Sequence, residues 1–198
     1  MTKDNTAASA AAGKPANPEV EALIAQMGQT RSLPEAEMLA RKALALQPDH
    51  PGLHLSLGII LHNRGKVAAA QAAYGECLKL DRKNVRALIN LGSLQVDAGH
   101  PEPGLMALEA ALHLAPGHTE ARFHKARAFG RMGKTGEALE ILDELARKMP
   151  ENVPVLKMLA LCHREIGNTA EAAKVLDQAA RLAPDDKAIA NAIAKLAN

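Results

Sequence analysis

The fold is decided by residues 51–84, PGLHLSLGIILHNRGKVAAAQAAYGECLKLDRKN. The first half, LHLSLGIILHNRG, has apolar residues at the spacing of one helix face and ends on Gly65. Glycine can adopt the left-handed backbone conformation that closes a helix, so Gly65 marks the end of a first helix. The second half, AAAQAAYGECLKLD, supplies the helix that returns. The stretch therefore predicts two antiparallel helices joined by a turn.

The same pattern recurs along the chain with a period of 34 residues. Glycines keep this spacing at Gly65, Gly99, Gly133 and Gly167. Prolines, which cannot continue a helix, keep it or its double at Pro48, Pro116, Pro150 and Pro184, and alanines do so at Ala36, Ala70, Ala138 and Ala172. After a disordered tail at 1–16, we expect five blocks, at residues 17–50, 51–84, 85–118, 119–152 and 153–186.

The composition favours a purely helical fold. Hydrophobic residues make up 47% of the 198 residues and aromatic residues only 2%. The core must therefore be built from Ala and Leu, which favour closely packed helices over strands. Because one helix pair cannot bury its apolar faces alone, neighbouring pairs must stack. Residues 187–198 place Ile189, Ile193 and Leu196 on one helix face, which predicts a helix that caps the stack.

These blocks resemble the tetratricopeptide repeat, a 34-residue pattern of large and small residues at fixed positions with a proline near its end. In 153–186 the pattern is met by Leu156, Leu159, Ala160, His163, Ala172, Leu176, Ala179 and Pro184. In 51–84 it is met by His54, Leu57, Gly58, Leu61, Ala70, Tyr74 and Cys77. The resemblance covers residues 17–186 and implies an all-α fold, a right-handed α-solenoid of stacked antiparallel helix pairs.

Some positions depart from this pattern. Ile24 and Arg31 depart from it in 17–50, as suits a terminal repeat with one uncovered face, and Arg82 replaces the proline in 51–84. Lys125 stands where the pattern has Leu. An ammonium group among apolar side chains is costly unless it reaches water or a carboxylate, so we expect Lys125 to do one or the other.

The charge balance and the cysteine content restrict partners and location. The 24 basic and 22 acidic residues leave a net charge of +2, which gives no reason to expect a nucleic-acid partner. No apolar run approaches 18 residues, so no membrane span and no membrane partner are predicted. Two cysteines form no disulfide framework, which favours the cytoplasm. The initial Met and the terminal cap suggest a complete protein.

The sequence contains no constellation for catalysis. It lacks a phosphate-binding glycine loop, HExxH, GxSxG and CxxC, so we expect no catalytic residues and no cofactor. The eight histidines fall at different repeat positions, and no pair lies four apart within one predicted helix, so no metal site is expected. Cys77 and Cys162 are predicted to be small core residues.

The resemblance implies a ligand groove on the inner surface, lined by the first helix of each block. The predicted partner-binding residues are Leu55, Ile59, His62, Arg86, Ile89, Asn90, Phe123, Arg127, Arg131, Lys157, Leu161 and Arg164. Leu55, Ile59, Ile89 and Phe123 would form an apolar strip facing solvent, unless tight curvature packs them against the adjacent helix. The basic residues near the C-terminal end favour a protein or peptide segment with apolar anchors and acidic residues.

Two known groove types are absent. Asn90 is the only residue that matches either the carboxylate clamp for chaperone tails or the asparagine ladder of nucleocytoplasmic sugar transferases. The sequence therefore predicts a non-enzymatic adaptor or scaffold. One alternative is the substrate-recognition arm or subunit of an enzyme, such as a glycosyltransferase or a sulfotransferase. Another is self-association through the uncapped first repeat.

Overall fold

A computed structural model describes residues 17–196, which form helices and no strands. The predicted disordered tail at 1–16 lies outside the described residues, as do the last two residues of the predicted cap. The helices are α1 (Pro18–Gln29), α2 (Leu33–Leu46), α3 (Pro51–Asn63), α4 (Val67–Leu80), α5 (Val85–Asp97), α6 (Pro101–Leu114), α7 (Thr119–Arg131), α8 (Thr135–Lys148), α9 (Val153–Glu165), α10 (Thr169–Leu182) and α11 (Lys187–Leu196). They belong to two compact units, which divide between Leu94 and Gln95 within α5. The all-α prediction is confirmed.

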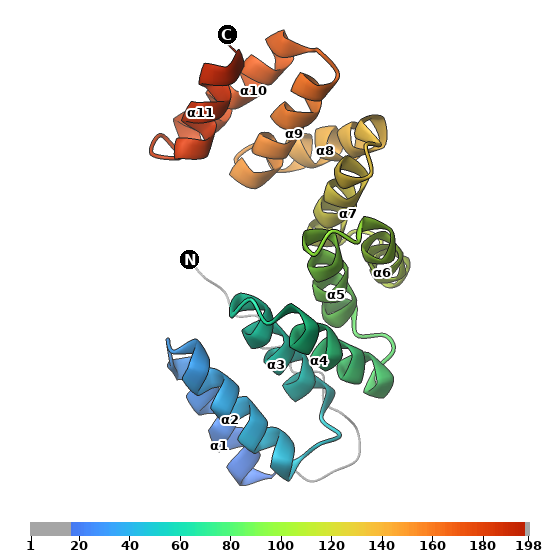
Figure 1. Cartoon of the computed structure of the whole chain (residues 1–198), viewed down its shortest axis with the longest axis vertical. Helices are drawn as coiled ribbons and strands as arrows, with labels where there is room; N and C mark the ends of the chain where they lie inside the picture. Colours follow the sequence, from blue (N-terminus) through green and yellow to red (C-terminus); the bar gives the residue numbers. More distant parts are fainter. Residues whose placement is uncertain (1–16, 197–198) are drawn as a thin grey trace. The chain divides into compact units, whose positions relative to one another are not determined.

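Unit one is built from stacked helix pairs. Helix α1 packs on α2, α2 on α3, and α3 on α4, with the two helices of each pair side by side in Figure 1. The core between them consists mainly of Ala and Leu side chains around the fully buried ring of Tyr74. Small residues such as Ala40 and Ala70 let the helices approach closely. The Ala-rich composition is therefore used as the sequence predicts.

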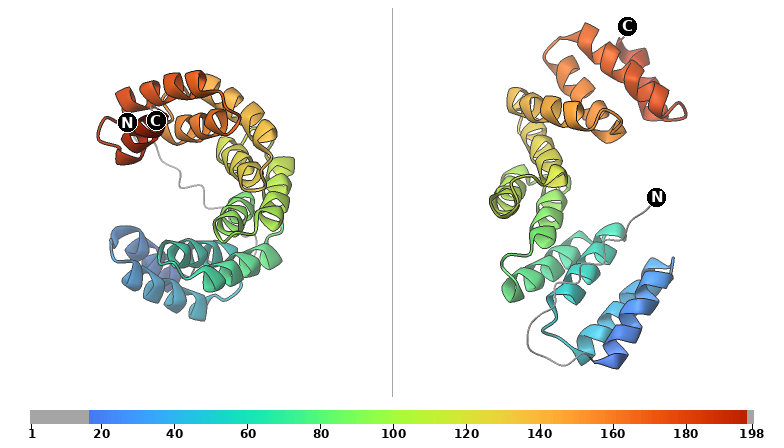
Figure 2. Two further views of the ribbon diagram at one scale, coloured as in Figure 1. Left: turned by 45° about the horizontal axis from the view of Figure 1, so that its top comes forward. Right: turned by 180° about the vertical axis from the view of Figure 1, so that it is seen from behind.

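Unit two is built in the same way and ends on α11. Its core includes Leu142, Leu145 and Leu156, all fully buried, and reaches Ile189 of α11, which is 1% exposed. Ile193 and Leu196 are partly buried against the same core. Figures 1 and 2 show α11, in red, beside α10. The apolar face predicted for 187–198 therefore packs on the preceding pair.

The helix ends follow the glycine and proline pattern. Each of the four period-keeping glycines has a positive φ, between 71° and 86°, directly after a first helix of a pair. Helix α2 ends two residues before Pro48, and the other prolines stand at the same distance after their helices. Helix α4 ends at Leu80 without a proline, because Asp81 accepts hydrogen bonds from the Lys83 backbone N–H and the Asn84 side chain. A polar turn therefore replaces proline in 51–84.

Lys125 finds a carboxylate. Its Nζ lies 2.9 Å from Oε1 of Glu109 on α6 and 5.5 Å from the ring centre of Phe129. A carboxylate and an aromatic face both favour a cation, so the ammonium does not stand alone in the core. The substitution of Lys for Leu is thereby accommodated within unit two.

Polar contacts between residues about 30 apart tie successive helix pairs together. In unit two, Arg127 pairs with Asp97, Thr135 donates a hydrogen bond to Glu165, and Lys157 pairs with Asp186. In unit one, the buried carboxylate of Glu37 on α2 binds Arg64 and Lys66, which flank the α3–α4 turn. Arg41 approaches the same carboxylate from within α2, with Nη2 3.0 Å from Oε1.

Glu37 is expected to make folding sensitive to acid. The hydrogen bond from Lys66 is the main cause that lowers its pKa from 4.5 to about 2; Arg41 and Arg64 add to it, and burial opposes it. Because an unfolded Glu takes up its proton before folded Glu37 does, stability falls as the pH falls from 4.5 to about 2. Glu37→Gln should lower the free energy of unfolding by about 1 to 3 kcal/mol at neutral pH and remove this acid dependence.

Urea unfolding between neutral and acid pH checks this expectation. The matched control is Glu76→Gln, which removes an exposed carboxylate paired with Lys79 within α4 and should change the unfolding midpoint far less. Equal midpoints for Glu37→Gln and the wild type at neutral pH would contradict the assigned role of Glu37.

Candidate functional site

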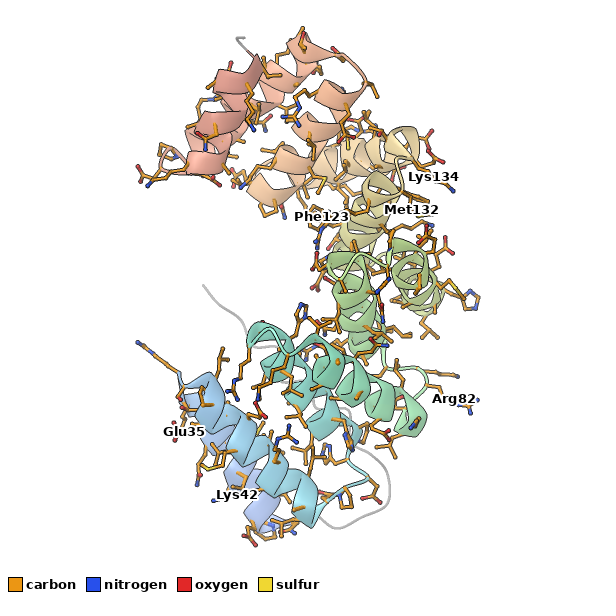
Figure 3. The ribbon with its side chains drawn as sticks, viewed as in Figure 1. Glu35, Lys42, Arg82, Phe123, Met132 and Lys134 are labelled. Carbon is orange, nitrogen blue, oxygen red and sulfur yellow. The ribbon has the colours of Figure 1, made fainter. Side chains whose placement is uncertain are left out.

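Part of the predicted apolar strip is buried. Leu55 is 7% exposed and belongs to the unit-one core with Tyr74, and Ile89 is 2% exposed. The expectation that these two side chains face solvent is wrong, because an apolar side chain near the edge of a packed helix face gains more by covering its neighbours than by meeting water. Ile59 and Phe123 are half-buried, and both pack against the core of their own unit. Figure 3 shows Phe123 on α7.

Two of the four predicted basic groove residues are held by carboxylates of the chain. Arg127 pairs with Asp97 and lies 3.0 Å from Nδ1 of His124. Lys157 Nζ lies 2.8 Å from Oδ2 of Asp186. The prediction that both are available to an acidic ligand is therefore wrong, because each ties its helix to a neighbouring helix pair.

The other two basic residues remain exposed. Arg131 is the last residue of α7, and Arg164 lies in the last turn of α9. Within the described range 17–196, neither of them forms an ion pair. Of the polar groove residues in unit one, Arg86 is exposed and His62 and Asn90 are half-buried. The Asn90 amide donates to the Arg86 carbonyl in its own helix, at 2.9 Å.

The candidate site is a hollow of about 420 Å³ between α9 and α11, here called the α9–α11 pocket. One wall is the face of α9 that carries Pro154, Met158 and Leu161, and the other is the face of α11 that carries Ala188, Ala192 and Leu196. Leu176 and Ile189 line it from the core. The two small alanines leave space that larger side chains would fill, so the pocket can receive an apolar side chain.

The charges of the pocket lie on α9. Lys157 reaches Asp186, whose Oδ1 accepts hydrogen bonds from the backbone N–H groups of Ala188 and Ile189 at the start of α11. The hydrogen bond from Lys157 lowers the pKa of the Asp186 carboxyl below its ordinary value. This ion pair fixes the start of α11 against α9. Arg164, two turns along α9 from Lys157, leaves one cation in the lining for a ligand carboxylate.

Sequence reasoning found only part of this site. Lys157, Leu161 and Arg164 were predicted for the groove, and all three line the pocket. Met158 and Ala192 were missed as ligand-facing residues. Ala188 and Ala192 are four residues apart on a helix whose other apolar residues are large, so this spacing is the signal that could have indicated a hollow.

The described residues offer no alternative reactive centre. Cys77 and Cys162 are free and buried, and burial raises the pKa of each thiol to about 11, so both are core residues as predicted. Among residues 17–196, no group of three or more His, Cys, Asp or Glu side chains is placed to hold a metal ion. Within the same range, no helix is long and apolar enough to cross a membrane.

Comparison with known proteins identifies the repeat. Tetratricopeptide repeat models match residues 24–76 and 131–196. Among solved structures, the chain is similar to YrrB, described as a TPR protein with an unusual peptide-binding site (TM-score 0.70, 21% identity, 88% of this chain and 90% of that chain). It is also similar to a tetratricopeptide repeat protein from Parabacteroides merdae (TM-score 0.76, 22% identity, 91% and 73%). A third similar structure is MamA from Desulfovibrio magneticus (TM-score 0.75, 17% identity, 86% and 98%).

One curated relative is an enzyme. The chain is 32% identical over 103 residues to the human protein O-mannosyl-transferase TMTC3. The match covers 52% of this chain and 11% of that protein, so the chain spans a small part of its relative.

Proposed function

Because the chain belongs to the tetratricopeptide repeat family, whose fold is that of a protein interaction scaffold, we propose that it is a non-enzymatic adaptor that binds a segment of a partner protein at the α9–α11 pocket. The observation that carries the proposal is an apolar hollow with one unpaired cation, Arg164, in its lining. YrrB, whose fold this chain shares, is described as having a peptide-binding site, which supports a peptide ligand here.

The pocket selects the chemistry of the ligand. A hollow of about 420 Å³ lined mainly by Leu, Met, Ala and Ile takes one or two apolar side chains of the partner. A carboxylate next to such an anchor can form a charge-assisted hydrogen bond with Arg164. Arg131 extends the positive charge to the end of α7 in the same unit. The expected ligand is therefore a peptide segment with apolar anchors and acidic residues.

Affinity capture tests this proposal. The wild-type chain and an Arg131→Glu plus Arg164→Glu variant serve as baits in an extract of the native cells. The control bait carries Arg181→Glu and Lys195→Glu, the same charge change at exposed residues that do not line the pocket. We expect the wild type and the control to retain the same partner and the Arg131, Arg164 variant to lose it, most clearly at low salt. Equal retention by all three baits at low salt would reject a site that uses these arginines.

The match to TMTC3 favours a second candidate, the recognition arm or subunit of a transferase. In that case the retained partner would be the acceptor protein or the catalytic subunit of a glycosyltransferase. Capture followed by an assay for mannosyl transfer separates the two candidates, because an adaptor adds no transferase activity. A second copy of the chain among the retained proteins would indicate self-association instead.

Both cysteines are free thiols, which suits a reducing compartment, and we propose that the adaptor works in the cytoplasm.

A further inference from the structure

Unit one carries an open groove along one face of α2, here called the α2 groove. It has a volume of about 480 Å³. Pro34, Met38 and Ala45 form its apolar part, and Arg41, Lys42 and Arg64 form its charged part. The segment from Pro34 to Ala45 spans about 16 Å at 1.5 Å per helical residue, which is room for several residues of an extended chain.

The groove is strongly positive in a protein that is nearly neutral. The carboxylate of Glu37 lies at its base and is contacted by Arg41, Arg64 and Lys66. Lys42 adds a fourth cation on the same helix, and Figure 3 shows it on α2. Four cations around one carboxylate leave a local excess of positive charge, which attracts an anionic partner.

Glu37 also holds these cations in place. Arg41 uses Nε and Nη2 for bonds of 3.1 and 3.0 Å to Oε1, and Lys66 Nζ lies 2.9 Å from Oε2. A guanidinium has five N–H donors, and the Arg41 side chain remains 56% exposed. Arg41 can therefore keep its bonds to Glu37 and still donate to a ligand. Because its position is already fixed, it loses little side-chain freedom on binding.

The apolar part of the groove distinguishes between anionic partners. Met38 is 49% exposed in the middle of the groove, between the cations and next to no aromatic lining residue. Single-stranded nucleic acids bind with their bases stacked on aromatic rings, which this groove lacks. A protein segment can supply carboxylates for the cations together with an apolar side chain for Met38.

We propose that the α2 groove is a second docking surface, which binds a carboxylate-rich segment of a partner protein through Arg41 and Lys42, with an apolar side chain placed on Met38. This surface lies in unit one and does not depend on the α9–α11 pocket in unit two. The two proposals can therefore fail separately.

A model peptide tests the proposal on the full chain. The probe is a fluorescein-labelled peptide with three copies of Glu-Glu-Ala-Leu, and its counterpart has Lys in place of Glu. The test variant is Arg41→Gln plus Lys42→Gln. The matched control is Lys79→Gln plus Lys83→Gln, which removes the same charge from exposed positions in the same unit but outside the groove. Circular dichroism confirms that all variants are folded.

Fluorescence anisotropy gives the dissociation constants. We expect the test variant to bind the acidic probe at least about tenfold more weakly than the wild type, since two charge-assisted contacts are lost, and the control to stay within about twofold. The Lys counterpart should not bind, and added salt should weaken the wild type more than the test variant.

Three results would overturn the proposal. The first is equal affinity of the wild type and the test variant for the acidic probe. The second is loss of probe binding in Arg164→Gln but not in the test variant, which would assign the probe to the α9–α11 pocket and leave the proposed function standing. The third is tighter binding of a single-stranded DNA oligonucleotide than of the probe, which would make the surface a nucleic-acid site.

Discussion

Removal of residues 187–198 is expected to lower the free energy of unfolding by about 3 to 6 kcal/mol. Ile189 is 1% exposed, and full burial of such a side chain contributes about 1.5 to 3 kcal/mol. Ile193 and Leu196 are partly buried on the same core and add smaller amounts. The truncation also exposes Leu156 and Leu176 on the preceding pair and removes one wall of the pocket. Urea unfolding and size-exclusion chromatography measure the two consequences, lower stability and association.

Point variants separate the loss of this packing from other effects of shortening the chain. Ile189→Ala should cost about 2 to 4 kcal/mol, because it leaves a cavity in the core. Ala190→Ser, at an exposed position of the same helix, should have little effect. If the truncated chain kept its unfolding midpoint and remained monodisperse, α11 would have no structural role.

Gly58→Ala is the single substitution with the largest expected effect, about 2 to 4 kcal/mol of destabilisation. A Cβ atom at Gly58 on α3 would lie 2.5 Å from both Cδ1 and Cε1 of Tyr74 on α4. The Tyr74 ring is fully buried and its neighbours are packed, so it cannot move aside without opening the core. The close approach of α3 and α4 therefore requires glycine at this position. Thermal and urea unfolding measure the loss.

The neighbouring helix provides a control for Gly58. Gly75 lies inside α4, and a Cβ atom there would meet no atom within 4 Å. Gly75→Ala should therefore stabilise the protein by about 0.5 to 1 kcal/mol, because Ala has the higher helix propensity. Combining Gly58→Ala with Tyr74→Leu should recover part of the lost stability, since the ring that clashes is gone. A Gly58→Ala variant as stable as the wild type would contradict the packing described for unit one.

The fold could be predicted from the sequence because its punctuation is local. A glycine that requires a positive φ, as at Gly65, ends a helix through the conformation of its own backbone. A proline such as Pro48 prevents a helix from continuing through its own ring. Neither effect depends on what packs nearby, and their common period of 34 residues therefore indicates the helix pairs directly.

The site could be predicted only in part because it depends on which side chains meet. Helical spacing places Leu55 and Leu161 on apolar faces alike, but the structure buries Leu55 in a core and leaves Leu161 in a pocket lining. In the same way, the sequence does not show that Lys157 meets Asp186, 29 residues away. Such contacts are set by the packing angle between helix pairs and not by the pattern within one pair.

The electrostatic account of the site changes accordingly. Reversing Lys157 would break a contact that fixes α11, so its effect on binding could not be separated from an effect on folding. Arg164 is free of this difficulty, because it forms no ion pair within the described residues. A test of the pocket itself should leave every charge unchanged.

The most direct test fills the pocket without touching its charges. The measurement is the dissociation constant of the captured partner segment, by isothermal titration calorimetry, for the wild type, Ala192→Phe and Ala190→Phe. Ala192 lines the pocket, whereas Ala190 is exposed on α11 and does not. We predict that Ala192→Phe remains folded and binds at least about tenfold more weakly, since its ring occupies the space of the ligand's anchor, and that Ala190→Phe binds like the wild type. Wild-type affinity in Ala192→Phe would contradict binding at the α9–α11 pocket.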